Sequence, residues 1–68
     1  MALIKREGGC KVGWHTYDDK AEAEAAAVAA RELAARMGES GYDFGWVSPG
    51  NIKEGTLDGQ TVWTVTVP

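Results

Sequence analysis

Residues 18–38, DDKAEAEAAAVAARELAARMG, carry the strongest secondary-structure signal in the chain. The segment is dominated by alanine, glutamate, leucine and arginine, which are good helix formers. Asp19 is a suitable N-cap residue, with Glu22 three positions later, as in a capping box. Gly38 can adopt the left-handed conformation that ends many helices. The sequence therefore predicts one helix over residues 20–37.

One side of this helix carries almost only small apolar groups. At about 100° per residue, the residues on this side span an arc of about 120°. They are Ala23, Ala26, Ala27, Ala30, Leu33, Ala34 and Met37. Side chains this small let a helix lie close to a sheet, so large sheet residues are needed to fill the remaining volume. Trp14, Trp46 and Trp63 are the candidates.

A second apolar patch lies on the opposite side of the helix. The patch consists of Ala21, Val28 and Ala35, and it is bordered by the charged residues Glu24 and Arg31. Two interpretations are open. Either Val28 is an isolated exposed valine, which is common, or two copies of the helix pack antiparallel, with Glu24 and Arg31 pairing across a twofold axis.

Two short runs before the helix, residues 2–6 and 10–17, are separated by Glu7-Gly8-Gly9. A glycine pair supplies the positive φ angles of a tight turn, so these runs predict a β-hairpin. After the helix, aromatic residues alternate with smaller ones over residues 41–47, which favours a strand.

The last third of the chain predicts a second hairpin. Asp58-Gly59 is a frequent two-residue turn, and the residues that follow it, 60–67, alternate between two faces as in a strand. Residues 52–57 are either a short strand or part of a loop. The chain is thus expected to form a single α+β domain over residues 1–68, with the order ββαββ and one helix on one face of a mainly antiparallel sheet.

The opposite face of this sheet has no second helix to cover it. Val62, Thr64 and Thr66 share that face of the last strand and are only partly polar. A surface of this kind either meets a partner or stays polar. Val62 and Thr64 are therefore candidates for a dimer formed through the sheet, as an alternative to the helix patch.

The size and composition of the chain favour a partner subunit. A chain of 68 residues buries only about 60% of its unfolded surface, and one cysteine with one histidine makes neither a disulfide framework nor a zinc site. No cofactor is expected. A net charge of −3 disfavours nucleic acid. No apolar run reaches the roughly 20 residues that span a bilayer, so we expect no membrane contact and a cytoplasmic location.

No catalytic constellation is visible in the sequence. In an extended strand, Cys10 and His15 lie on opposite faces about 16 Å apart. Asp18 and Asp19 are better explained as helix-capping residues than as an acid–base pair. We therefore expect no enzymatic activity.

Aromatic residues are the main functional candidates. Tyr17, Tyr42, Phe44 and Trp46 form a candidate aromatic surface that can stack on bases or sugars. Such a surface on the 42–46 strand would make the protein a small-ligand or nucleotide-binding module. Packing in the core is the competing explanation for the tryptophans.

Residues 11–17 (KVGWHTY), the Ala/Glu/Arg helix, residues 41–45 (GYDFG) and the final WTVTVP, residues 63–68, resemble short uncharacterised proteins of high-GC actinobacteria and their phages. The resemblance implies no established activity and no site residues. The leading hypothesis is a small non-enzymatic accessory protein that binds protein, as a homodimer. A host or phage protein is the alternative partner.

Overall fold

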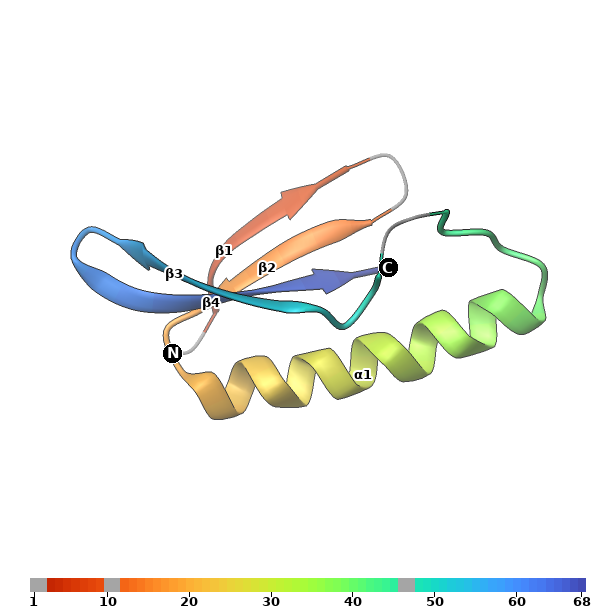
Figure 1. The fold of residues 1–68 in the computed structure, drawn as a ribbon, viewed down its shortest axis with the longest axis horizontal. Helices are drawn as coiled ribbons and strands as arrows, with labels where there is room; N and C mark the ends of the chain where they lie inside the picture. Colours follow the sequence, from red (N-terminus) through yellow and green to blue (C-terminus); the bar gives the residue numbers. More distant parts are fainter. Residues whose placement is uncertain (1–2, 10–11, 46–47) are drawn as a thin grey trace.

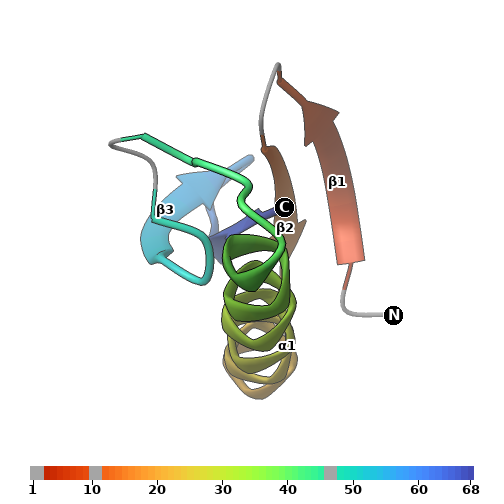
Figure 2. The same ribbon diagram turned by 90° about the vertical axis from the view of Figure 1, so that its right-hand side faces the viewer.

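The computed structural model describes residues 3–9, 12–45 and 48–68. In chain order its elements are β1 (Leu3–Gly8), β2 (Gly13–Tyr17), α1 (Lys20–Glu39), β3 (Ile52–Leu57) and β4 (Gln60–Val67). The strands form one antiparallel sheet in the order β1-β2-β4-β3. α1 lies along one face of this sheet (Figures 1 and 2). The predicted α+β fold with the order ββαββ is confirmed.

The segment between α1 and β3 differs from its prediction. Residues 41–45 form no strand, and residues 46 and 47 lie outside the described part of the chain. Gly41 and Gly45 have φ angles of 92° and 67°, which an extended strand does not allow. The Asp43 carboxylate accepts a hydrogen bond from the Gly45 N–H at 2.8 Å, as in an Asx turn. The third strand is instead residues 52–57, for which the sequence left strand and loop open.

One of the two hairpin turns lies where the sequence predicts it, and the other does not. Asp58 and Gly59 have φ angles of 52° and 78°, so the predicted two-residue turn is confirmed. In the first hairpin, β1 continues through Gly8 and β2 begins at Gly13, so the turn predicted at Glu7-Gly8-Gly9 lies later in the chain. Gly9 donates to the Val12 carbonyl at 2.7 Å across this turn.

α1 begins where the sequence predicts. Asp19 is the N-cap, and its side chain accepts hydrogen bonds from the N–H groups of Ala21 and Glu22. The helix ends two residues later than predicted, because Gly38 is helical and Gly41 takes the left-handed position. The Tyr42 and Gly41 N–H groups donate to the carbonyls of Met37 and Gly38, which is a Schellman motif.

Replacing the N-cap Asp19 by alanine is expected to lower the free energy of unfolding by about 1 kcal/mol, because two helix N–H groups lose their acceptor. Urea denaturation followed by circular dichroism measures the change. Asp18→Ala is the matched control, since it removes a neighbouring carboxylate and keeps the cap. Equal effects of the two substitutions would contradict the capping role.

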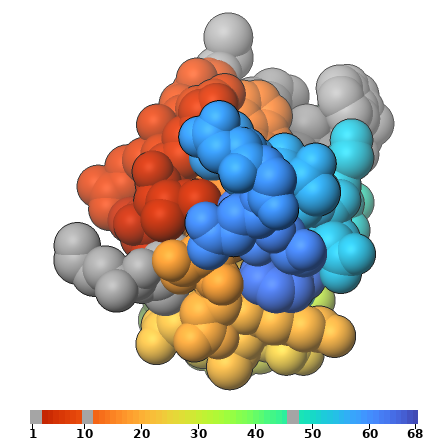
Figure 3. Space-filling model, turned by 90° about the vertical axis from the view of Figure 1, so that its left-hand side faces the viewer, coloured from red at the N-terminus to blue at the C-terminus, as the bar shows by residue number. Residues whose placement is uncertain are grey.

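The core lies between α1 and the helix side of the sheet. Its fully enclosed residues are Ala23, Ala27 and Val65, and partly buried apolar residues pack around them: Tyr17, Ala26, Ile52, Trp63 and Val67. The predicted packing of a methyl-lined helix against a large ring is confirmed for Trp63. It is wrong for Trp14, which pairs with Thr66 and points to the opposite face. Figure 3 shows the two layers from one end, with helix atoms below strand atoms.

The connection from α1 to β3 is fixed at Gly50. The Gly50 N–H donates to the Thr66 carbonyl at 2.7 Å, and the Thr66 N–H donates to the Asn51 carbonyl at 3.0 Å. From the helix, Arg31 Nη2 donates to the Gly50 carbonyl at 3.0 Å. Gly50 thus joins the helix and the central strand β4.

Candidate functional site

The sheet face opposite α1 is the first candidate surface, and we call it the open face. Among the described residues, no helix or strand covers it. It is hollowed into a groove of about 500 Å³, which lies within the range of ligand and partner sites. The groove is lined by Lys5, Glu7, Trp14, Thr16, Lys53, Glu54, Gly55, Thr56, Leu57, Val62 and Thr64.

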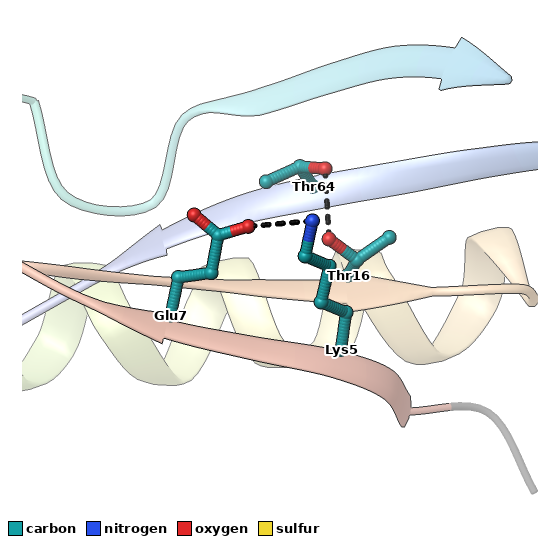
Figure 4. A network of polar contacts seen from close by, with 4 residues as sticks. All are labelled: Lys5, Glu7, Thr16 and Thr64. Atoms are coloured by element: carbon teal, nitrogen blue, oxygen red, sulfur yellow. Dashed lines mark hydrogen bonds and ion pairs between the residues drawn. The ribbon is translucent and has the colours of Figure 1, made fainter. Parts of the chain in front are cut away.

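The floor of the groove comes from the two central strands. Thr16 on β2 and Thr64 on β4 are paired across the strands, and their hydroxyl oxygens lie 3.1 Å apart (Figure 4). Val62 is 5% exposed beside them. Because the threonine hydroxyls bond to each other, the floor presents mainly methyl groups to the groove.

The edges of the groove carry charges of both signs. On β1, Lys5 Nζ lies 2.7 Å from a Glu7 carboxylate oxygen, and both side chains reach over the central strands (Figure 4). The hydrogen bond and charge of Glu7 raise the pKa of Lys5. On the opposite edge, Lys53 of β3 faces the same groove and has no ion pair among the described residues.

Two large apolar side chains stand exposed at the ends of the groove. Trp14 and Leu57 are each 39% exposed. The Trp14 ring packs over the backbone of Gly9, where an added Cβ would lie 3.0 Å from ring atom Cζ3. This contact places the indole beside Gly9, directly after the end of β1.

The helix patch proposed from sequence is on the surface. Ala21, Glu24, Val28, Arg31 and Ala35 are all exposed on α1. Arg31, however, is engaged with the Gly50 carbonyl of its own chain. Pairing with Glu24 of a second copy would compete with that bond.

Of the predicted aromatic surface, the structure describes Tyr17, Tyr42 and Phe44. Tyr17 is half-buried against the core on the helix side of the sheet. Tyr42 is 40% exposed, and its ring lies 4.6 Å from that of Phe44 at an interplanar angle of 55°. Trp46 lies outside the described residues. A tilted pair offers no flat platform for stacking a base.

Sequence reasoning placed Val62 and Thr64 on the uncovered side of the sheet but missed Lys5, Trp14, Lys53 and Leu57 there. A signal for Trp14 was present, because the alternation in the second strand puts Trp14 and Thr16 on one face. The missing information was that Thr16 pairs with Thr64. That register is a contact between residues far apart in the chain.

The residues considered for catalysis or metal binding are placed as follows in the described part of the chain. His15 lies on the helix side of the sheet, and Cys10 is outside the described residues. Residues 3–9, 12–45 and 48–68 contain no group of three or more metal-ligating side chains. Of the helices described, none has the apolar length that crossing a bilayer requires.

The comparisons with known proteins find no relative of this chain. The chain matches no family model, no curated protein and no solved structure. The candidate site is therefore defined by its geometry and charge alone.

Proposed function

We propose that the protein is a non-enzymatic binding module that forms a homodimer through the open face. The observation that carries this proposal is the groove itself, where exposed Trp14 and Leu57 flank a methyl-rich floor. Rigid aromatic side chains beside an apolar centre are typical of the residues that dominate binding energy at protein interfaces.

The small core supports a partner. Among the described residues, the buried apolar side chains are Val12, Ala23, Ala27, Ala30, Val62 and Val65, none larger than valine. Cores of domains this small contribute little net stability by themselves. Covering Trp14 and Leu57 with a second copy adds buried apolar area where the monomer has least of it.

The charges of the open face favour a second copy as the occupant. A twofold interface must be self-complementary, because the same patch lies on both sides. The groove offers both signs of charge, since Lys5 and Glu7 lie on its β1 edge and Lys53 lies on its β3 edge. A partner carrying only one sign of charge would meet repulsion at one or more of these positions.

The surface required is available on a protein of this size. A standard interface buries about 800 Å² on each partner. This is about a sixth of the 4588 Å² surface of the chain. The helix patch is the weaker choice, because its Arg31 already bonds within the chain.

Two substitutions that each introduce a charged side chain test the proposal. In sedimentation experiments at high micromolar concentration, the parent is expected at twice the 7.3 kDa monomer mass. Leu57→Glu is expected to weaken the dimer at least tenfold, or about 1.4 kcal/mol, because a carboxylate would be buried at the interface. Val28→Glu, at 49% exposure on α1, is the matched control and should leave the dimer intact.

Three outcomes would overturn the proposal: a monomeric parent, a dimer that survives Leu57→Glu, or a dimer lost only in Val28→Glu. The last would assign the contact to the helix patch. Circular dichroism of both variants confirms that the monomer fold is retained, which is expected because both side chains are exposed on the chain surface.

A further inference from the structure

A second hollow lies on the helix side of the sheet, away from the open face. α1 packs against β4, β2 and β3 but not against β1, in the part of the chain that the structure describes. The space left beside α1 is a crevice of about 400 Å³. Its walls are mainly apolar and include Tyr17, Ala26, Ala30, Leu33 and Val67. We call it the helix crevice.

One end of the helix crevice lies next to Arg6. His15 and Val67 line both this crevice and an adjoining hollow of about 560 Å³, to which Arg6 contributes. Arg6 and His15 are direct partners across β1 and β2, so both lie on the helix side of the sheet. The two hollows therefore adjoin at His15 and Val67, one of them mainly apolar and the other next to Arg6.

The basic end contains no ion pair among the described residues, although Glu7 and Pro68 also line the adjoining hollow. Arg6 has no ion pair there. Glu7 also touches the adjoining hollow, but its carboxylate is held by Lys5 on the open face (Figure 4). Burial lowers the pKa of His15, and the positive charge of Arg6 lowers it further. An anion placed between Arg6 and His15 would pair with the Arg6 guanidinium and would favour the protonated form of His15.

We propose that the helix crevice binds a small anionic amphiphile, with its apolar chain between Tyr17 and Leu33 and its carboxylate at Arg6 and His15. The alkyl chain of the ligand would cover the exposed apolar surface of Leu33, which is 39% accessible. An arginine that lacks a partner forms a charge-assisted hydrogen bond with a carboxylate. This site is independent of the proposed dimer, because it lies on the opposite face of the sheet.

Octanoate is the probe, and two-dimensional NMR of the full chain is the measurement. Resonances of His15, Tyr17 and Leu33 are expected to shift on titration, and the bound anion is expected to raise the pKa of His15. Hexanoate, two methylenes shorter, is expected to bind about fifteenfold more weakly, since each buried methylene contributes about fourfold. Octanamide, which lacks the charge, is expected to bind at least fivefold more weakly than octanoate.

Substitutions test the ion pair with the carboxylate and the apolar contact with the alkyl chain separately. Arg6→Gln is expected to weaken octanoate at least fivefold while leaving octanamide unchanged. Arg36→Gln, on the last turn of α1, is the matched control and should change neither. Leu33→Asp is expected to weaken both probes.

Equal affinity for octanoate and octanamide would overturn the proposal, as would an Arg6→Gln variant that binds like the parent. Shifts confined to Trp14 and Leu57 would place the probe on the open face and would also overturn it. The same titrations on Leu57→Glu separate this result from dimerisation, because the helix crevice is expected to bind octanoate equally in monomer and dimer.

Discussion

Replacing Gly50 by alanine is expected to lower the free energy of unfolding by about 4 kcal/mol, from backbone strain and overpacking together. Gly50 is buried and has a φ angle of 89°, in a region that side-chain-bearing residues rarely adopt. An added Cβ would overlap Arg31 Cγ and would lie 2.9 Å from the Ala27 carbonyl oxygen. The arginine can move aside, but the helix backbone cannot.

Alanine substitutions at two other glycines separate the effect of backbone strain from that of overpacking. Gly59 has a φ angle of 78° with no atom within 4 Å of an added Cβ, so Gly59→Ala is expected to cost only about 1 kcal/mol from strain. Gly38 is helical with open space around it, so Gly38→Ala is expected to stabilise by about 0.5–1 kcal/mol. Urea denaturation of the three variants measures the series.

The double variant Gly50→Ala with Arg31→Ala tests which contact dominates. It is expected to recover only part of the lost stability, because the Ala27 carbonyl remains in place. A Gly50→Ala variant that is no less stable than Gly59→Ala would show that Gly50 does not join helix and sheet closely. The expected result instead makes this glycine the point where the segment after α1 is fixed to β4.

Features of the fold that depend on neighbouring residues were predictable from the sequence. The N-cap at Asp19, the methyl-lined side of α1 and the Asp58-Gly59 turn each follow from a few adjacent side chains and their backbone preferences. The end of α1 was misplaced by two residues. Gly38 and Gly41 can both end a helix, and the hydrogen bonds of Tyr42 and Gly41 favour the later one.

Features that depend on pairing between distant segments were not predictable. The alternation of Tyr42 and Phe44 is typical of a strand, but Gly41, Gly45 and the Asp43 turn bend the backbone there. The side of the sheet that Trp14 faces depends on the pairing of β2 with β4. A one-residue change in that register would move Trp14 to the core.

The candidate site was only half predictable for the same reason. Val62 and Thr64 could be assigned to an uncovered face from their own strand. Lys5 and Lys53 join them only because β1 and β3 are the two edges of the sheet. The order β1-β2-β4-β3 therefore creates the groove, with its apolar centre and charged edges, from residues that are far apart in sequence.

Substituting leucine for Ala27 is expected to be the second most destabilising change, at about 3 kcal/mol. Ala27 is 1% exposed and packs with Ala23 and Val65, where helix and sheet approach most closely. A larger side chain must push α1 away from β4 or force Val65 from its place. Because the Ala27 carbonyl also lies beside Gly50, moving the helix disturbs the Arg31 hydrogen bond as well.

Thermal denaturation measures this effect, with Ala25→Leu as the matched control on the exposed side of α1. The melting temperature of Ala27→Leu is expected to fall by about 12–24 °C, since about 1 kcal/mol corresponds to 4–8 °C in a domain of this size. Ala25→Leu is expected to stay within about 0.5 kcal/mol of the parent. Equal melting temperatures for the two variants would mean that the helix tolerates large side chains on both sides. The close approach of α1 to the sheet, and with it the need for a partner to complete a small core, would then be wrong.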